Sequence, residues 1–237
     1  MNPLYSLLAV VGLTLVHLFS AELPLFSREP RSRWLSVAGG VPVAFVFLSL
    51  LPAIAQDQAL VDAGATLLPD HLYLLALVGL LAFYAVERVV RARVRRGGPE
   101  PHPSSDAVFW VSIGSFAGMN AIIGYLLIQQ ERPARNLVVF AVAMALKFMV
   151  DDYGLHKDHH RAYDRRGRWI VVGALALGWA VGLLTTVPTF AIAALRAFLA
   201  GGILLNMLKE ELFGAQEGRV WAFTLGALAY AALLLML

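Results

Sequence analysis

The chain contains no cysteine among its 237 residues. This absence excludes a disulfide framework and any metal site built on thiolates. Charged residues are also scarce: they make up 15% of the chain, whereas a typical soluble domain has about 25%. Residues 1–16 carry no charged side chain, so they lack the positive n-region of a signal peptide and we expect them to begin a membrane-spanning helix.

Apolar residues make up 59% of the chain and occur in long blocks. A block of 18 or more apolar residues with few charges is typical of a transmembrane helix. Short segments rich in Pro, Gly and Arg separate the blocks, as expected of loops. The sequence therefore predicts an all-α integral membrane protein, a single transmembrane domain over residues 1–237. Its eight predicted helices cover approximately residues 3–21, 34–55, 70–91, 106–130, 135–155, 169–186, 189–213 and 219–237.

The basic residues alternate from loop to loop. The loops after the first, third, fifth and seventh predicted helices, counted together with the helix ends that adjoin them, hold 15 of the 19 Lys and Arg residues. The positive-inside rule places these loops in the cytoplasm and both termini outside, in a multi-pass protein of the cell membrane. Membrane topology accounts for the positions of the basic residues, so we expect no nucleic-acid partner. The expected partner of the chain is the lipid bilayer.

The fifth predicted helix carries charge near its middle. Lys147 and Asp151 are four residues apart and share one face of the helix, and Asp152 follows. A charge at the bilayer centre costs about 2.5–3.5 kcal/mol on insertion scales, so such residues are functional candidates by default. Two interpretations stay open: an ion pair that joins helices, and a polar step on a cation or proton pathway.

A histidine-rich segment follows, with His156, His159 and His160 at i, i+3 and i+4. It matches the HxxHH box of membrane di-iron hydroxylases, and its imidazoles could face one ion. Those enzymes use several such boxes, however, and the other three histidines, His17, His71 and His102, form none. We therefore expect no catalytic site. The segment is interpreted as a solvated interfacial segment or a peripheral metal site.

The pattern of eight spans resembles the ZIP (Zrt/Irt-like) family of divalent-metal transporters. The second span, residues 38–52, runs from Ala-Gly-Gly into Leu-Leu-Pro, and the seventh, residues 200–212, begins with the same Ala-Gly-Gly. This echo is consistent with an inverted repeat. The resemblance implies an arrangement of three, two and three helices, with both termini outside and a divalent cation as substrate.

The metal-binding motifs of the resemblance are largely replaced. In the fourth span Ser115 stands where a histidine ligand is expected and Met119 where a carboxylate is expected. In the fifth span Lys147 and Phe148 replace two expected ligands, and Asp151 alone keeps a metal-binding side chain. The resemblance places the transport pathway along Ser115, Met119, Asn120, Lys147, Asp151 and Asn206. A displaced metal site nearer the cytoplasm would use Asp151, Asp152, His156, His159, His160, Glu210 and Glu211.

Three functions remain open from the sequence. The first is a ZIP-like transporter of a divalent metal such as zinc, manganese or iron, in which the metal is the substrate and no cofactor is certain. The second is a non-transporting protein on the same fold that acts as a scaffold, sensor or partner subunit. The third is a proton-coupled carrier of an organic solute. The small-residue faces of the spans would also allow a homodimer.

Overall fold

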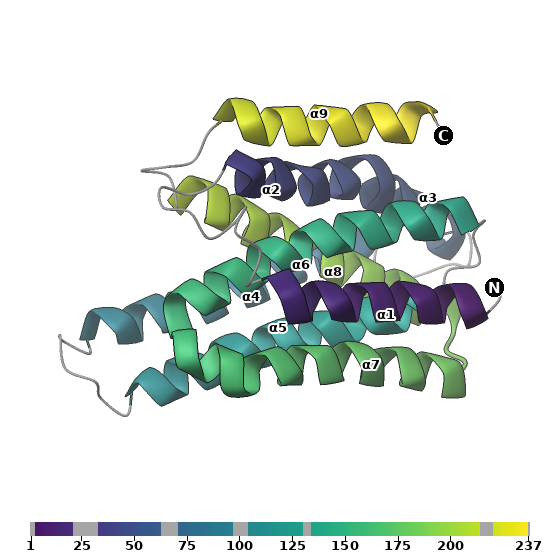
Figure 1. The fold of residues 1–237 in the computed structure, drawn as a ribbon. Coiled ribbons are helices and arrows are strands. Elements are labelled where there is room, and N and C mark those ends of the chain that lie inside the picture. The colour runs from purple at the N-terminus through teal and green to yellow at the C-terminus, as the bar shows by residue number, and fades with distance from the viewer. Residues whose placement is uncertain are drawn as a thin grey trace.

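The protein folds into a bundle of long helices whose two termini lie at the same end (Figure 1). The computed structural model describes residues 3–20, 33–62, 71–96, 104–129, 134–213 and 220–236. These residues are almost entirely helical, and no strand occurs among them. The prediction of an all-α chain is therefore confirmed.

The helices, with the π-helical segments marked η, have the following bounds: α1 Pro3–Phe19, α2 Arg33–Phe45, η2 Val46–Leu50, α3 Leu51–Asp62, α4 His71–Arg96, α5 Ser104–Gln129, α6 Ala134–Ala162, η3 Tyr163–Gly167, α7 Arg168–Leu184, α8 Thr189–Phe213 and α9 Val220–Met236. Each of the eight predicted ranges coincides with one of these helices or with a continuous run of them. The second predicted helix corresponds to α2, η2 and α3, which follow one another without interruption.

The largest difference from the predicted ranges lies after residue 155. The fifth predicted span ends near that residue, its helix is expected to run on towards His156, His159 and His160, and a loop is expected to follow. Instead α6 continues to Ala162, and η3 and α7 follow it directly, so the chain reverses direction without a coil (Figure 1). A run of Lys, Asp and His has ordinary helix propensity, and polarity alone therefore does not end a helix. The turn lies at the end of the bundle opposite the termini.

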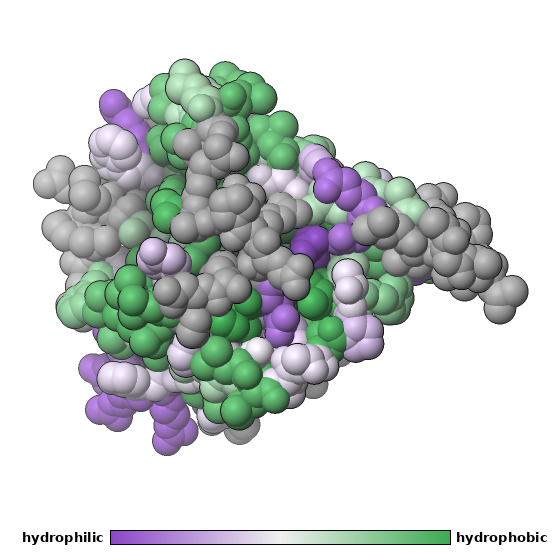
Figure 2. Space-filling model, turned by 90° about the vertical axis from the view of Figure 1, so that its right-hand side faces the viewer, coloured by the Kyte–Doolittle hydropathy of each residue, from purple (hydrophilic) through white to green (hydrophobic). Residues whose placement is uncertain are grey.

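Within the described ranges, five helical segments are long and apolar enough to cross a membrane. They span Arg33–Ala59, His71–Ala92, Ala107–Gln129, Tyr163–Leu184 and Thr189–Lys209, and α1 and α9 contain shorter apolar helices. Helix α6 is also long, but Lys147, Asp151 and Asp152 make it more polar. Many large apolar side chains face outward, and hydrophobic residues make up much of the coloured surface in Figure 2. These features indicate a membrane protein, because a soluble monomer rarely exposes such continuous apolar surface.

Three helix pairs pack most closely: α5 with α7, α4 with α8, and α2 with α9. Glycines on both members of each pair allow the backbones to approach. At Gly178 of α7, for example, an added Cβ would lie 2.0 Å from the carbonyl oxygen of Ala121 in α5. The reciprocal pairs are Gly124 with Gly178, Gly79 with Gly201, and Gly40 with Gly226. Such contacts replace the hydrophobic driving force that is lacking between helices in lipid.

We predict that Gly178→Ala destabilises the protein, because the new methyl group must push α5 and α7 apart. Overpacking of this kind costs about 1–3 kcal/mol, which corresponds to a fall on the order of 5 °C in unfolding temperature. The matched control is Gly173→Ala in the same helix, where a Cβ meets no atom within 4 Å. Thermal unfolding in detergent measures both variants. Equal unfolding temperatures would contradict the importance of this close contact.

Candidate functional site: a buried polar cluster

Helices α1, α5 and α6 bring five polar side chains together in the interior. We call His17, Asn120, Lys147, Asp151 and Asp152 the polar cluster; all five are buried, and Lys147 and Asp152 are completely inaccessible. Three of them come from α6, where one turn separates Lys147 from Asp151. Because these side chains are shielded from solvent, every charge in the cluster depends on its protein partners rather than on water.

Lys147 and Asp151 form an ion pair along one face of α6, as the spacing predicts. The Lys147 ammonium also lies 5.3 Å from the ring centroid of Phe148 and 5.9 Å from that of Phe116, within range of cation–π attraction. The second carboxylate oxygen of Asp151, Oδ1, is buried and has no hydrogen-bond partner among the described residues. An unsatisfied buried acceptor is costly, so this atom is a candidate contact for a proton or another cation.

Asp152 accepts hydrogen bonds from three other side chains. His17 Nδ1 lies 2.9 Å from Oδ1 and 3.0 Å from Oδ2. The Ser20 hydroxyl donates to Oδ2 at 2.6 Å, and the Tyr163 hydroxyl donates to Oδ1 at 2.5 Å. Because His17 and Ser20 end α1 and Tyr163 begins the turn into α7, this one carboxylate holds three parts of the chain together.

The contacts of His17 place an acceptor at each of its ring nitrogens. Its Nδ1 faces a carboxylate, which only accepts. Its Nε2 lies 3.1 Å from Oδ1 of Asn120, and that amide is oriented by its Nδ2, which donates to the Phe116 carbonyl at 2.9 Å. Both ring nitrogens therefore face acceptors, and both contacts are hydrogen bonds only when each nitrogen carries a proton. The geometry fits an imidazolium.

The cluster is then electrically neutral. With His17 protonated, two positive groups, Lys147 and His17, balance two negative groups, Asp151 and Asp152. The Phe148 ring lies between the two ion pairs, because it stacks on the His17 ring at 4.1 Å and also contacts Lys147. Loss of one proton from His17 would leave one net negative charge in an apolar interior, where uncompensated charge is strongly disfavoured.

The structure joins some of the predicted site residues and separates others. Asn120, Lys147, Asp151 and Asp152 meet in the cluster. Met119 and Asn206 lie together elsewhere, with Asn206 Nδ2 4.0 Å from the Met119 sulfur. The Ser115 hydroxyl donates to the carbonyl of Ser112 within its own helix.

The histidine segment lies on the last turns of α6. His156 Nδ1 is 3.1 Å from Asp164, and the His159 ring packs 5.4 Å from that of Phe109. The side chains of His160, Glu210 and Glu211 lie outside the described residues. Within the part of the chain whose side chains are described, no group of three or more His, Asp or Glu side chains could hold a metal ion.

Sequence reasoning missed His17, Ser20 and Tyr163 as members of the site. His17 was set aside because it belongs to no histidine box. The signal that could have found it is its position, since an ionisable residue within an apolar span requires a partner, and Asp152 was an unpaired candidate. Tyr163 was assigned to a loop, so no contact with the interior was expected.

No protein-family model matches the chain, and no curated protein sequence matches it. The similarity to ZIP transporters therefore stays a prediction from the motifs.

We predict that Lys147→Met is more damaging than the double variant Lys147→Met/Asp151→Leu. The single change leaves a buried carboxylate without its counter-ion, which costs about 3–5 kcal/mol, whereas an apolar pair of similar volume is often neutral or stabilising. Unfolding temperatures in detergent measure both variants. A double variant as unstable as the single one would contradict the assignment of the pair as mutually neutralising.

Proposed function

We propose that the protein is a proton-coupled membrane transporter of a small organic solute, in which the polar cluster is the proton-binding site. The observation that carries the proposal is the pair of hydrogen bonds around His17, which can form together only when both ring nitrogens carry a proton. An intramembrane ionisable residue that is held between acceptors is typical of a proton relay.

Proton loss from His17 would change the packing of three helices. A neutral ring can donate from only one nitrogen, so its other nitrogen would face an acceptor, either Asp152 or the Asn120 oxygen. Rotation of the Asn120 amide would relieve one clash but would break its hydrogen bond to the Phe116 carbonyl. Protonation therefore stabilises the contact of α1 with α5 and α6, and deprotonation favours their separation. This is the coupling of charge to conformation that a transporter requires.

A route for protons leads from the cluster to one end of the bundle. Asp152 is joined to the Tyr163 hydroxyl, and the Tyr163 ring lies 6.4 Å from that of His156. His156 and its partner Asp164 are partly exposed, with side-chain exposures of 37% and 43%. Tyr163 and His156 therefore lie between Asp152 and the surface of the α6–α7 turn, and each carries a group that can both donate and accept a proton. The same end carries the basic residues that we assign to the cytoplasm.

The packing of the helices supports a transporter with internal repeats. Helix α5 packs on α7, α4 on α8 and α2 on α9, while α6 contacts both α1 and α2. Suppose that α1, α2 and α4 exchange places with α7, α8 and α9, in that order, and that α5 exchanges with α6. The α2–α9 contact then becomes the α8–α4 contact. The α1–α6 contact becomes the α7–α5 contact. Inverted repeats that move relative to each other are a common basis of alternating access.

Divalent-cation transport is the second candidate. It is favoured by this same pairing of helices and by the Asp151 oxygen that lacks a partner. The Lys147 ammonium, however, occupies the carboxylate that a metal would need, and one exchangeable positive charge at His17 matches a proton better than a divalent ion. A divalent metal would have to displace both the Lys147 ammonium and the proton on His17.

We predict that liposomes containing the purified protein take up at least one small organic solute when an inward proton gradient is imposed. Asp152→Asn should abolish this uptake, because the amide does not balance an imidazolium. The matched control is Glu87→Gln, the same change from carboxylate to amide in a partly buried ion pair with Arg91 and Lys209, and it should retain most activity.

A panel of organic acids, amines and sugars is compared with Zn²⁺, Mn²⁺, Fe²⁺ and Cd²⁺ in the same vesicles. Uptake of a metal that is lost in Asp151→Asn would replace the proposal with the ZIP-like function. Absence of any gradient-driven uptake by a correctly folded protein would favour the non-transporting alternative.

A further inference from the structure

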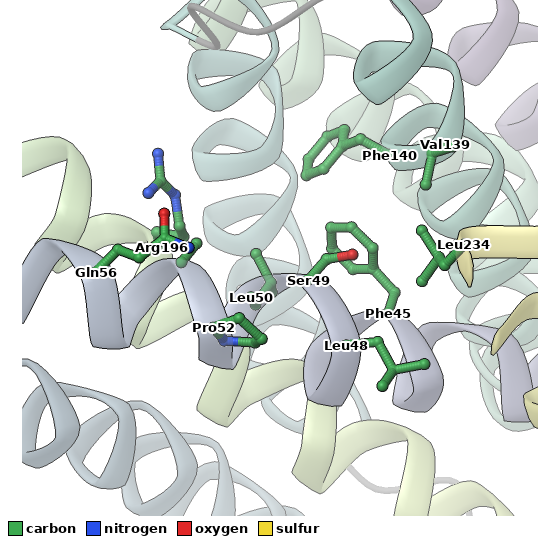
Figure 3. Close-up of a pocket in the computed structure, with 11 residues that line it drawn as sticks. Phe45, Leu48, Ser49, Leu50, Pro52, Gln56, Val139, Phe140, Arg196 and Leu234 are labelled. Carbon is green, nitrogen blue, oxygen red and sulfur yellow. The ribbon is translucent and has the colours of Figure 1, made fainter. Parts of the chain in front are cut away.

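A cavity of about 390 Å³ lies on the other side of the bundle from the α1–α5 contacts, between α2–η2–α3, α6, α8 and α9. Its volume is within the range of small-molecule sites in proteins. Figure 3 shows Arg196 and Gln56 on one side and the rings of Phe45 and Phe140 on the other. The cavity is thus polar on one side and apolar on the other.

The local fold of the second span explains why the space exists. Pro52 has no backbone N–H and cannot continue the regular helical hydrogen bonds. The preceding residues form the π-helix η2, in which the Leu51 N–H bonds to the Val46 carbonyl. Insertions of this kind widen a helix locally and occur frequently at functional sites. Leu48, Ser49, Leu50 and Pro52 of this widened segment line the cavity.

Arg196 is the one charged side chain among the described residues that line the cavity. Its guanidinium Nη1 donates to Asp57 Oδ2 at 2.5 Å, and Asp57 does not itself line the cavity. Both side chains are largely buried, at 15% and 17% exposure. A guanidinium offers five donors in a planar fork that matches a carboxylate. Asp57 therefore holds Arg196 in place and also competes with any anion that enters.

We propose that this cavity binds the transported solute and that the solute is a small organic carboxylate. The carboxylate would engage Arg196, aided by Ser49 and Gln56, and its apolar part would lie against Phe45 and Phe140. This inference rests on the proposed function and names its substrate class. A carboxylate substrate also fits the single exchangeable proton of the polar cluster. One carboxylate that crosses the membrane together with one proton carries no net charge.

Helix α6 links the two sites. Phe140 lines the cavity, and Lys147 lies seven residues further along the same helix, which corresponds to about 10 Å at 1.5 Å per residue. A solute that pushes on Phe140 therefore acts on the helix that carries both aspartates of the cluster.

The test is direct binding of benzoate to the full-length protein in detergent, measured by calorimetry, with the neutral isostere benzamide as the matched ligand. Benzoate should bind and benzamide should bind at least about tenfold more weakly, since a hydrogen-bonded charge pair is worth more than its neutral counterpart. Equal binding of the two ligands, or no binding of benzoate, would overturn the proposal.

Two variants should have opposite effects. Arg196→Gln should weaken benzoate binding by about tenfold or more, whereas Asp57→Asn should strengthen it by removing the competing carboxylate. If both changes weaken binding to the same extent, the pair is purely structural and the proposal is wrong. Ser49→Leu, which fills the cavity without touching either charge, should also abolish binding; unchanged binding would place benzoate elsewhere.

The same assay separates this inference from the proposed function. Asp152→Asn should still bind benzoate, because Asp152 does not line the cavity, although it should lose proton-coupled uptake. Benzoate binding without coupled uptake in the wild-type protein would refute the proton-coupled function while the carboxylate site stands. Coupled uptake of another solute without benzoate binding would refute the carboxylate site alone.

Discussion

The carboxylate of Asp152 is the group on which the interior of this protein depends. It is completely buried, and donors from the end of α1 and from the α6–α7 turn surround it. A buried carboxylate is tolerated only when its charge is balanced and its oxygens are hydrogen-bonded. The position of His17, the path of the chain after Ala162 and the orientation of Asn120 all follow from this requirement.

The apolar exterior and the glycine contacts set the background for this cluster. Helices in lipid gain little from hydrophobic association, so close backbone packing at glycines and a few internal polar contacts hold them together. The two features have different consequences for function. The glycine pairs fit together sterically whatever the protonation state, whereas the contacts of His17 depend on one proton. Only the His17 contacts can therefore change when a proton binds or leaves.

Much of the architecture could be predicted from the sequence, because long apolar blocks and alternating basic loops report directly on the medium that surrounds each segment. The Lys147–Asp151 pair was also predictable, since both residues lie on one helix and four residues fix their distance. In the structure Lys147 and Asp151 form the expected ion pair. The number of membrane crossings and the orientation in the membrane stay predictions from the basic loops.

The contacts between helices could not be predicted in this way. The partner of His17 is 135 residues away in the chain, and no local spacing joins the two residues. The helical path through Tyr163 was hidden because polar residues at the membrane boundary resemble a loop, although they form a π-helical turn that returns a tyrosine to the core. The cavity beside Arg196 depends on four separate segments of the chain, which no local sequence pattern brings together.

The most direct test of a proton-binding cluster is nitrogen NMR of the protein labelled with ¹⁵N-histidine, with the His17→Gln variant used to assign the His17 signals. An imidazolium held between Asp152 and Asn120 predicts that both ring nitrogens of His17 carry protons at neutral pH. It also predicts that one of these protons is lost as the pH is raised, together with a change in the signals of α1 and α5. A His17 ring that is a neutral tautomer throughout would contradict the assignment, and so would one that never releases its proton while the fold is intact.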